Sequence, residues 1–239
     1  MATASSTEQQ AAQAGIVRAA GIALAAGWRQ WLTSDRDPRR LKAITWALAV
    51  KHGRSSAGLA GRYYLAVRQS SGLPGGTIRF APDPTPQVVA RLVDETLSPL
   101  LDLGTREHRV AVLKELDTGL GDTISDTGRA TLLGTIADDR SAKGWARIPE
   151  PDACAFCALL ATRGVRNDGT SRAVYRADTV KFAPHPGCRC AVEPVFNAYE
   201  PSAQIREWTA MYAASTKGVP GGGTNLLNAF RRAYEGRTP

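Results

Sequence analysis

Apolar residues recur three or four positions apart over most of the chain before residue 140, which is the spacing of one face of an α-helix. Asp37 followed by Pro38 is typical of a helix start, because aspartate caps free N–H groups and proline is tolerated at the first helical position. The sequence therefore predicts a helix from Pro38 to about Gln69. Its apolar face is formed by Leu41, Ile44 and Leu48.

Residues 70–86 interrupt this helical pattern. They contain several serines and glycines and four prolines, a composition typical of an exposed loop. We expect a brief strand at residues 77–80 within the loop. Thr85 and Pro86 then begin a second helix, whose core-facing residues are predicted to be Val88, Val89, Leu92 and Val93.

Two further helices are predicted before residue 140. Thr105 is expected to cap the first of them, and the second covers residues 125–139. No internal repeat is visible, which favours a helical bundle over a solenoid. The apolar residues predicted for these two helices are Val110, Leu113, Leu116, Leu132, Leu133 and Ile136.

The pattern changes after residue 140. A short helix is expected to begin around Phe156, Leu159 and Leu160, and Tyr175, Val180 and Phe182 are expected to form one edge of a small hairpin. Trp145 is predicted to anchor this region to the bundle, because a large aromatic side chain buries much apolar area.

Two helices are predicted in the last 40 residues, separated by glycines at 221–223. Ser202 is expected to cap the first of them and Thr224 the second. Three regions follow: a helical region at 1–140 with its loop at 70–86, a central module at 141–200, and a helical tail at 201–239. The apolar positions of the two helices are Ile205, Trp208, Met211, Leu227, Phe230 and Tyr234.

Composition is consistent with a soluble protein that has a hydrophobic core. The chain has 239 residues, of which 43% are hydrophobic and 22% charged. The most apolar stretch, residues 15–27, contains Arg18 and is too short to span a bilayer. The N-terminus has no basic segment ahead of an apolar one, so we expect no secretory signal and an intracellular origin.

Charge is distributed unevenly along the chain, whose net charge is +8. Residues 28–68 contain nine basic and two acidic side chains, whereas residues 90–140 contain ten carboxylates and six basic side chains. A basic segment beside an acidic one suggests contact with nucleic acid or with an acidic protein ring. The alternative is a solvated helix face, which the absence of a nucleic-acid-binding motif favours.

All four cysteines lie in two short segments. Cys154 and Cys157 form a Cys-x-x-Cys pair, and about 30 residues later come His185, Cys188 and Cys190. Two thiolates from each segment can complete a tetrahedral zinc site, and a closed site with four protein ligands is typical of a structural role. We call residues 154–190 the knuckle. It offers five candidate ligands for four positions, with His185 competing against the cysteines.

Three alternatives to a metal site were weighed. Disulfides are disfavoured by an intracellular origin and by the small ring that Cys154 and Cys157 would close. Buried structural cysteines would be scattered among the helices rather than grouped. A nucleophile, Cys157 or Cys188 activated by His185, would need a third, orienting residue that the sequence does not reveal. Metal binding is the favoured interpretation.

The same residues resemble a known family. The segments at 144–147, 151–160 and 185–194, which contain GWAR, CAFC and HPGCRC, are similar to phage Mu F-like minor head proteins of the type found in tailed phages and prophages of actinobacteria. The similarity is strong from about residue 140 to residue 196. It is looser in the C-terminal tail, and the N-terminal helices match only in character.

The resemblance implies a phage minor capsid protein inside the head, near the portal vertex, that assists head assembly and DNA packaging or ejection. The implied partners are the portal protein and the major capsid protein or scaffold, with packaged DNA as a further candidate. It implies a virion protein made in the host cytoplasm, with no membrane and no small-molecule substrate. The predicted fold class is mainly α: a helical bundle, a small zinc-stabilised α+β module and C-terminal helices.

Members of this type are often labelled capsid maturation proteases, which provides the alternative function. The chain has three histidines, His52, His108 and His185, and neither an HExxH nor a GxSxG motif. We therefore assign no catalytic residue and favour a binding role over an enzymatic one. A DNA-binding zinc protein without a capsid role is a third possibility.

Basic residues are frequent between and within the two cysteine segments. They suit contact with DNA and simple solvation equally well. These candidate nucleic-acid-binding residues are Arg163, Arg166, Arg172, Arg176, Lys181 and Arg189.

Overall fold

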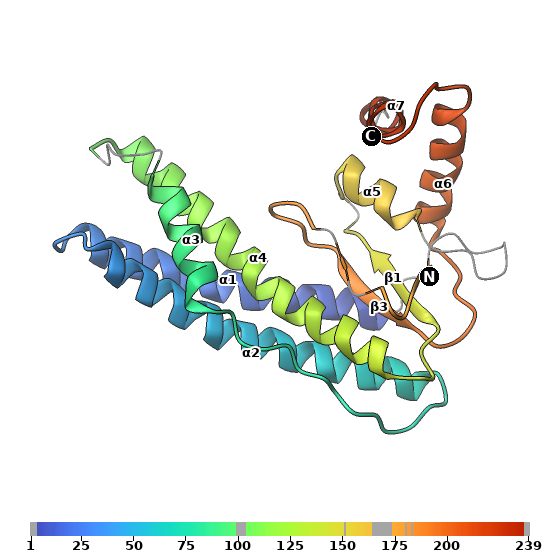
Figure 1. Cartoon of the computed structure of the whole chain (residues 1–239), viewed down its shortest axis with the longest axis horizontal. Helices are drawn as coiled ribbons and strands as arrows, with labels where there is room; N and C mark the ends of the chain where they lie inside the picture. The colour runs from blue at the N-terminus through green and yellow to red at the C-terminus, as the bar shows by residue number, and fades with distance from the viewer. Residues whose placement is uncertain are drawn as a thin grey trace.

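The computed structural model describes residues 4–98, 104–150, 152–163, 174–179, 181–182 and 184–236. Three long helices, α1 (Ala4–Leu32), α2 (Pro38–Ser70) and α4 (Arg106–Asp138), lie side by side in an elongated bundle, with the short α3 (Pro86–Leu97) packed across it (Figure 1). Within the described residues, no helix is long and apolar enough to cross a membrane.

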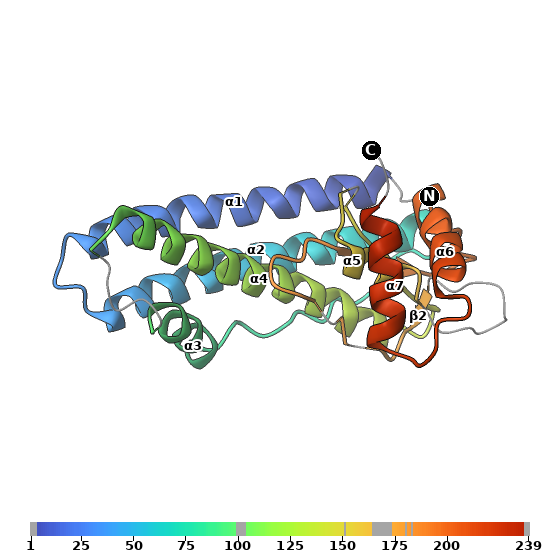
Figure 2. The same cartoon turned by 90° about the horizontal axis from the view of Figure 1, so that it is seen from above.

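A small sheet and three helices lie at one end of this bundle (Figures 1 and 2). The antiparallel strands β1 (Gly144–Ile148), β2 (Val174–Arg176) and β3 (Ala191–Val195) are arranged in the order β2-β1-β3. The remaining helices are α5 (Ala155–Ala161), α6 (Ala203–Thr216) and α7 (Thr224–Glu235). The predicted fold class, mainly α with a small α+β part, is confirmed.

The side chain of Trp145 joins the sheet to the bundle. It is fully buried and stacks on Tyr175 with 4.2 Å between ring centroids. It shares one core cluster with Tyr64 of α2 and Leu132 of α4. Burying an indole ring stabilises the contact between two elements by a large apolar area. The predicted anchoring role of Trp145 is confirmed.

Three predicted helix caps are present. Asp37 accepts a hydrogen bond from the N–H of Arg39, Thr105 from that of His108, and Ser202 from that of Ile205. The predicted cap at Thr224 is wrong by one residue, because Gly223 precedes α7 with a φ of 56°. Glycine adopts this left-handed conformation without steric cost, so it can end the turn there.

The two helices predicted on either side of residue 120 are one continuous helix, α4. Glycines at 119 and 121 lie in the part of α4 between the two predicted helices. A Cβ at Gly119 would overlap the side chain of Leu92, and one at Gly121 would lie 2.9 Å from Val17. These glycines allow α3 and α1 to approach α4 closely, and the packing outweighs the low helix propensity of glycine.

Val88, which was predicted to face the core, and Val110, an apolar residue of the next predicted helix, are both exposed. Val88 is 54% and Val110 58% exposed. In α3 the buried side chains include Val89 and Val93, and Val88 is rotated by about 100° around the helix from Val89 and further from Val93. In α4 the buried row begins at Val112, which places Val110 on the opposite face.

The strand predicted at residues 77–80 is absent. The backbone N–H groups of Arg79 and Ala81 instead donate to the hydroxyls of Thr135 and Thr131 on α4, at 3.0 and 3.1 Å. Threonine side chains of α4 thus accept the backbone hydrogen bonds that a neighbouring strand would accept in a sheet. Of the predicted hairpin edge, Tyr175 lies in β2 and Phe182 is buried beyond it, and Val180 lies outside the described residues.

Ion pairs connect the basic and acidic segments. Lys42 of α2 lies 2.7 Å from Asp94 of α3, and Arg68 of α2 lies 2.8 Å from Asp139 at the end of α4. A third basic side chain of α2, Arg54, pairs with Asp83 in the loop. Part of the basic surplus of residues 28–68 is therefore balanced within the chain.

We predict that Asp139→Asn destabilises the protein by about 1–3 kcal/mol, because a partly buried carboxylate loses charge-assisted hydrogen bonds. Burial alone would raise the pKa of Asp139, but hydrogen bonds from Tyr64 and Arg68 outweigh it and lower the pKa from 3.8 to about 2. The stabilisation is therefore present above about pH 4 and is lost as the pH falls towards about 2. Urea unfolding at pH 7 and pH 2.5 measures it. An equal difference between the two proteins at both pH values would contradict the prediction.

Candidate metal centre

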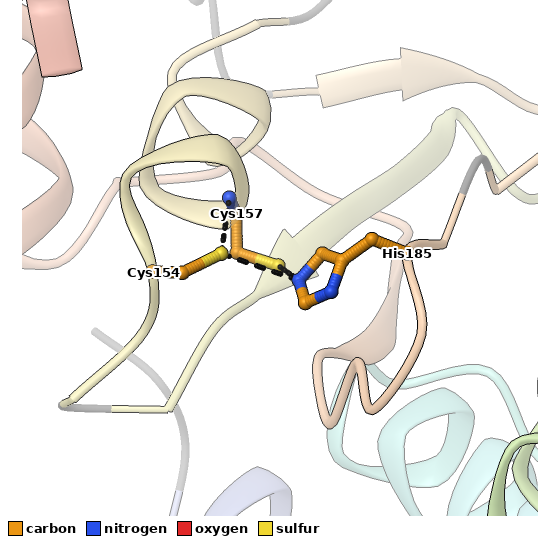
Figure 3. Close-up of side chains that lie close together, drawn as sticks. All are labelled: Cys154, Cys157 and His185. Atoms are coloured by element: carbon orange, nitrogen blue, oxygen red, sulfur yellow. Dashed lines mark hydrogen bonds between the residues drawn. The ribbon is translucent and has the colours of Figure 1, made fainter. Parts of the chain in front are cut away.

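The Cys-x-x-Cys segment forms the start of α5. Cys154 is the N-cap residue of this helix, and its Sγ accepts a hydrogen bond of 3.5 Å from the N–H of Cys157. Cys154 is exposed, whereas Cys157 is only 3% exposed. The first turn of α5 therefore brings the sulfur atoms of Cys154 and Cys157 close together on the same side of the helix (Figure 3).

His185 comes from the second segment and faces the same point. Its Nε2 atom lies 3.2 Å from Sγ of Cys154 and 3.1 Å from Sγ of Cys157 (Figure 3). Its Nδ1 atom lies 2.8 Å from the carbonyl oxygen of Pro186. Because a carbonyl only accepts, Nδ1 carries a proton, and Nε2 is the ring nitrogen that faces the two sulfurs. A backbone carbonyl fixes many metal-binding histidines in this way.

The remaining two cysteines complete the cluster. Sγ of Cys157 lies 3.7 Å from Sγ of Cys188, and a tetrahedral site with metal–sulfur distances of about 2.3 Å has sulfur–sulfur edges of about 3.8 Å. The ligand atoms of Cys157, Cys188 and Cys190 lie within 4.8 Å of one another, as do those of Cys154, Cys157 and His185. All five candidate ligands therefore meet around Cys157, and they can hold a metal ion.

Helix α4 holds the second segment in place. The N–H of Gly187, which has a φ of 73°, lies 3.0 and 3.1 Å from the two carboxylate oxygens of Asp122. Arg129 donates to the carbonyl oxygens of Cys188 and Cys190, and its own charge is paired with Asp126 at 2.5 Å. The backbone that carries three candidate ligands is thus fixed by two side chains about two turns apart on α4.

A buried arginine lies directly beside the sulfurs. Arg147 of β1 is 1% exposed, and its Nη1 atom is 3.9 Å from Sγ of Cys188. Its guanidinium stacks over the ring of Phe182 at 3.7 Å and donates to the carbonyl oxygen of that residue. A buried cation favours the charged form of neighbouring thiols. Arg147 therefore offsets part of the negative charge that a thiolate cluster brings into the core.

Contacts among Cys157, Cys188 and Cys190 shift the pKa values of these thiols. The pKa of Cys188 is far below the usual value, because Cys157 and Cys190 hydrogen-bond to its thiolate and Arg129 adds a positive charge. The same contacts, together with burial, raise the pKa of Cys157 far above the usual value. Metal ions bind cysteine as the thiolate, so metal binding would release the protons of the remaining thiols.

The geometry opposes the two alternatives that use cysteine chemistry. All four cysteines are free, and 3.7 Å between Sγ of Cys157 and Sγ of Cys188 is far beyond a disulfide bond. Both of these thiols are 3% exposed, so a substrate does not reach them as nucleophiles. His185 faces two sulfurs at nearly equal distance, which is the arrangement of a ligand rather than of a general base.

Three of the predicted nucleic-acid-binding residues have contacts within the chain. Arg163 hydrogen-bonds to Tyr212 at 2.6 Å, and Arg176 pairs with Asp178 at 2.9 Å. Arg189 lies 3.7 Å from Glu150. Lys181 is exposed, and Arg166 and Arg172 lie outside the described residues. Nucleic-acid binding stays a prediction.

The other two histidines are elsewhere on the bundle. His108 is exposed at the start of α4, and His52 lies partly buried in α2, where burial and Lys51 lower its pKa. Asp122 and Arg129 were not predicted from the sequence as residues of the site. They lie seven residues apart on one face of α4. The seven-residue spacing indicates that the two side chains share a helix face. The sequence does not indicate that this face contacts the knuckle.

We predict that Asp122→Ala lowers the affinity of the knuckle for a metal ion by about 10–100-fold, as is typical when an outer contact of a metal site is removed. The cause is the loss of the carboxylate that holds the N–H of Gly187. Competition with a chelator of known affinity measures the change. Glu115→Ala, an exposed carboxylate on the same helix, is the matched control. Equal affinities for the two variants would contradict the anchoring role of Asp122.

Comparison with known proteins places the chain in a family. The model of the VG15 protein family matches residues 1–215, a span that includes the three long helices and the whole metal centre. No curated protein and no solved structure matches the chain. The resemblance to Mu F-like minor head proteins stays a prediction. Because the match covers 215 of the 239 residues, the chain belongs to the VG15 family of viral proteins.

Proposed function

We propose that this protein is a phage minor capsid protein that binds near the portal vertex inside the head, and that its knuckle is a structural zinc site. The observation that carries the proposal is the convergence of all four cysteines and His185 on one point that α4 holds in place. Membership of a viral family and the similarity of the two cysteine segments to minor head proteins support it.

Zinc is the metal that fits these donors best. Soft thiolates with one imidazole in a tetrahedral arrangement favour zinc over magnesium, calcium or manganese, which prefer oxygen ligands. We assign Cys154, Cys157, His185 and Cys188 as the four ligands, with Cys190 next to them. When bound, zinc supplies folding free energy by cross-linking α5 to the 185–190 segment. The chain's own residues orient the ligands and neutralise part of their charge.

A closed site of this kind supports binding rather than catalysis, because no coordination position is left open for a substrate. The proposed partners are the portal protein and the major capsid protein or scaffold, which the protein meets while the head is assembled in the host cytoplasm. Packaged DNA is a further candidate partner inside the virion. The exposed Lys181 and Arg189 close to the centre are suited to phosphate contacts.

We predict that Cys157→Ser abolishes stoichiometric zinc binding, because Cys157 contacts both halves of the cluster. His185→Ala is expected to lower zinc affinity more than Cys190→Ser, since His185 is assigned as a ligand. Metal content after dialysis and the absorption bands of the cobalt-substituted protein measure both effects. The reverse order would assign the fourth position to Cys190, and full zinc content in Cys157→Ser would refute the site.

The capsid role is tested by co-expressing the chain with the portal protein and the major capsid protein of its phage. We expect a complex with the portal protein that survives size-exclusion chromatography, and an intact major capsid protein. Cys157→Ser is expected to reduce complex formation at least about tenfold, whereas Val110→Ala, an exposed change at the far end of α4, leaves it unchanged.

Two results would contradict this proposal. Absence of any complex with portal or capsid protein would remove the minor capsid role. Cleavage of the major capsid protein that depends on this chain would favour the alternative, a capsid maturation protease.

A further inference from the structure

The C-terminal helix α7 packs on the helix that carries the Cys-x-x-Cys pair. It contacts α5 and α6, and Figure 2 shows it lying over α5 with α6 at its side. Residues 217–223 connect α6 to α7, and Gly218, Gly221 and Gly223 in this linker adopt positive φ angles. Glycine adopts such angles without steric cost, so the linker can turn the chain back onto α5.

Apolar packing fixes α7 on α5. Phe230 of α7 is fully buried in a cluster that contains Leu159 of α5 and Trp208 of α6. Helix α5 has only seven residues, and a helix of this length is not stable on its own in water. The Cys-x-x-Cys segment therefore depends on the elements that pack on α5.

One polar contact connects α7 directly to the first candidate ligand. The hydroxyl of Tyr234 donates to the carbonyl oxygen of Ala153, the residue before Cys154. The ring centroid of Tyr234 lies 5.9 Å from that of Trp208 and 5.8 Å from that of Phe230. These neighbouring rings orient the hydroxyl. The hydrogen bond therefore constrains the planar peptide group that joins Ala153 to Cys154.

The two halves of the candidate centre are held by different parts of the chain. Asp122 and Arg129 of α4 fix the 185–190 segment. Cys154 belongs to the other half, and its side chain is exposed. Because its neighbours do not enclose this side chain, the position of its sulfur depends on the backbone that carries it. The hydrogen bond from Tyr234 acts on this backbone.

Exposure also makes Cys154 the ligand at which loss of zinc from the proposed site would begin. A competing chelator reaches an exposed sulfur before it reaches the sulfurs of Cys157 and Cys188, which are each 3% exposed. Detachment of one ligand opens a coordination position on the ion for the chelator. The rate of zinc loss should therefore depend on how firmly Cys154 is held.

We propose that Tyr234 is a positioning residue of the metal centre: through the carbonyl oxygen of Ala153, α7 holds Cys154 in its ligand position and slows the loss of the metal ion. The inference rests on the proposed zinc site and gives the C-terminal helix a function separate from ligand binding. A chain that binds no zinc would contradict both proposals. Normal zinc binding with unchanged release in the variants below would contradict this inference alone.

Zinc transfer from the loaded full chain to excess 4-(2-pyridylazo)resorcinol, followed by absorbance, measures the release rate. Tyr234→Phe removes the hydroxyl and keeps the ring. We expect it to release zinc about tenfold faster, as is typical when an outer contact of a metal site is lost. Tyr212→Phe is the matched control, because it removes a hydroxyl of the same cluster that contacts Arg163 beyond the other end of α5. It should leave the release rate unchanged.

A brief pulse of N-ethylmaleimide, followed by peptide mass spectrometry, tests whether the effect is local to Cys154. In zinc-loaded Tyr234→Phe we expect faster modification of Cys154 and unchanged modification of Cys188 and Cys190, since Arg129 still holds their backbone. A general loss of folding would instead expose all four cysteines together.

Phe230→Ala tests the role of α7 as a whole. Loss of this buried ring weakens the packing of α7 on α5, so zinc release should be at least as fast as in Tyr234→Phe. Unchanged release in this variant would show that α7 does not hold the site.

Three further outcomes would overturn the proposal. The first is an equal release rate for Tyr234→Phe and the unmodified chain. The second is equal acceleration by Tyr212→Phe, which would assign the effect to the general packing of the tail. The third is faster modification of all four cysteines in Tyr234→Phe, which would make Tyr234 a residue of the fold and not of the centre.

Discussion

The anchoring of the 185–190 segment on α4 is the contact on which the candidate metal centre depends. Cysteines from two segments about 30 residues apart must meet within bonding distance of one ion, and a loop alone does not hold them there. The carboxylate of Asp122 fixes the backbone at Gly187, and Arg129 fixes the carbonyl oxygens of Cys188 and Cys190. The long bundle therefore acts as a rigid support for a small ligand cluster, an arrangement that favours precise metal sites.

Charge balance explains why two arginines are buried at this place. A site with three or four thiolates carries a net negative charge even with a divalent ion, and burying that charge uncompensated is costly. Arg147 lies beside Sγ of Cys188, and Arg129 contacts the backbone of the same residue. Phe182 lies against both guanidiniums, at 3.7 Å from Arg147 and 4.9 Å from Arg129. The two guanidinium groups thus interact with the ring of Phe182 and with backbone carbonyl oxygens, and Arg147 also contacts a sulfur atom.

Local signals in the sequence predicted much of this structure. Asp37, Thr105 and Ser202 cap helices because their side chains act on the next few residues, so no distant contact is needed. The five candidate ligands were found for a similar reason, since cysteine spacing is a local property. The prediction failed where tertiary packing decides the outcome. The glycines of α4 are close-approach positions rather than breaks, and residues 77–80 bond to threonine hydroxyls on a helix. The roles of Asp122 and Arg129 depend on which face of α4 meets the knuckle, and one sequence does not reveal this.

The measurement that tests the account most directly is zinc K-edge X-ray absorption on the full chain purified without added metal and with its thiols kept reduced. The account predicts about one zinc ion per chain, with at least three sulfurs at about 2.3 Å and a nitrogen at about 2.0 Å in the first shell. A protein that carries no zinc, or a first shell made mainly of oxygen, would contradict the structural zinc centre.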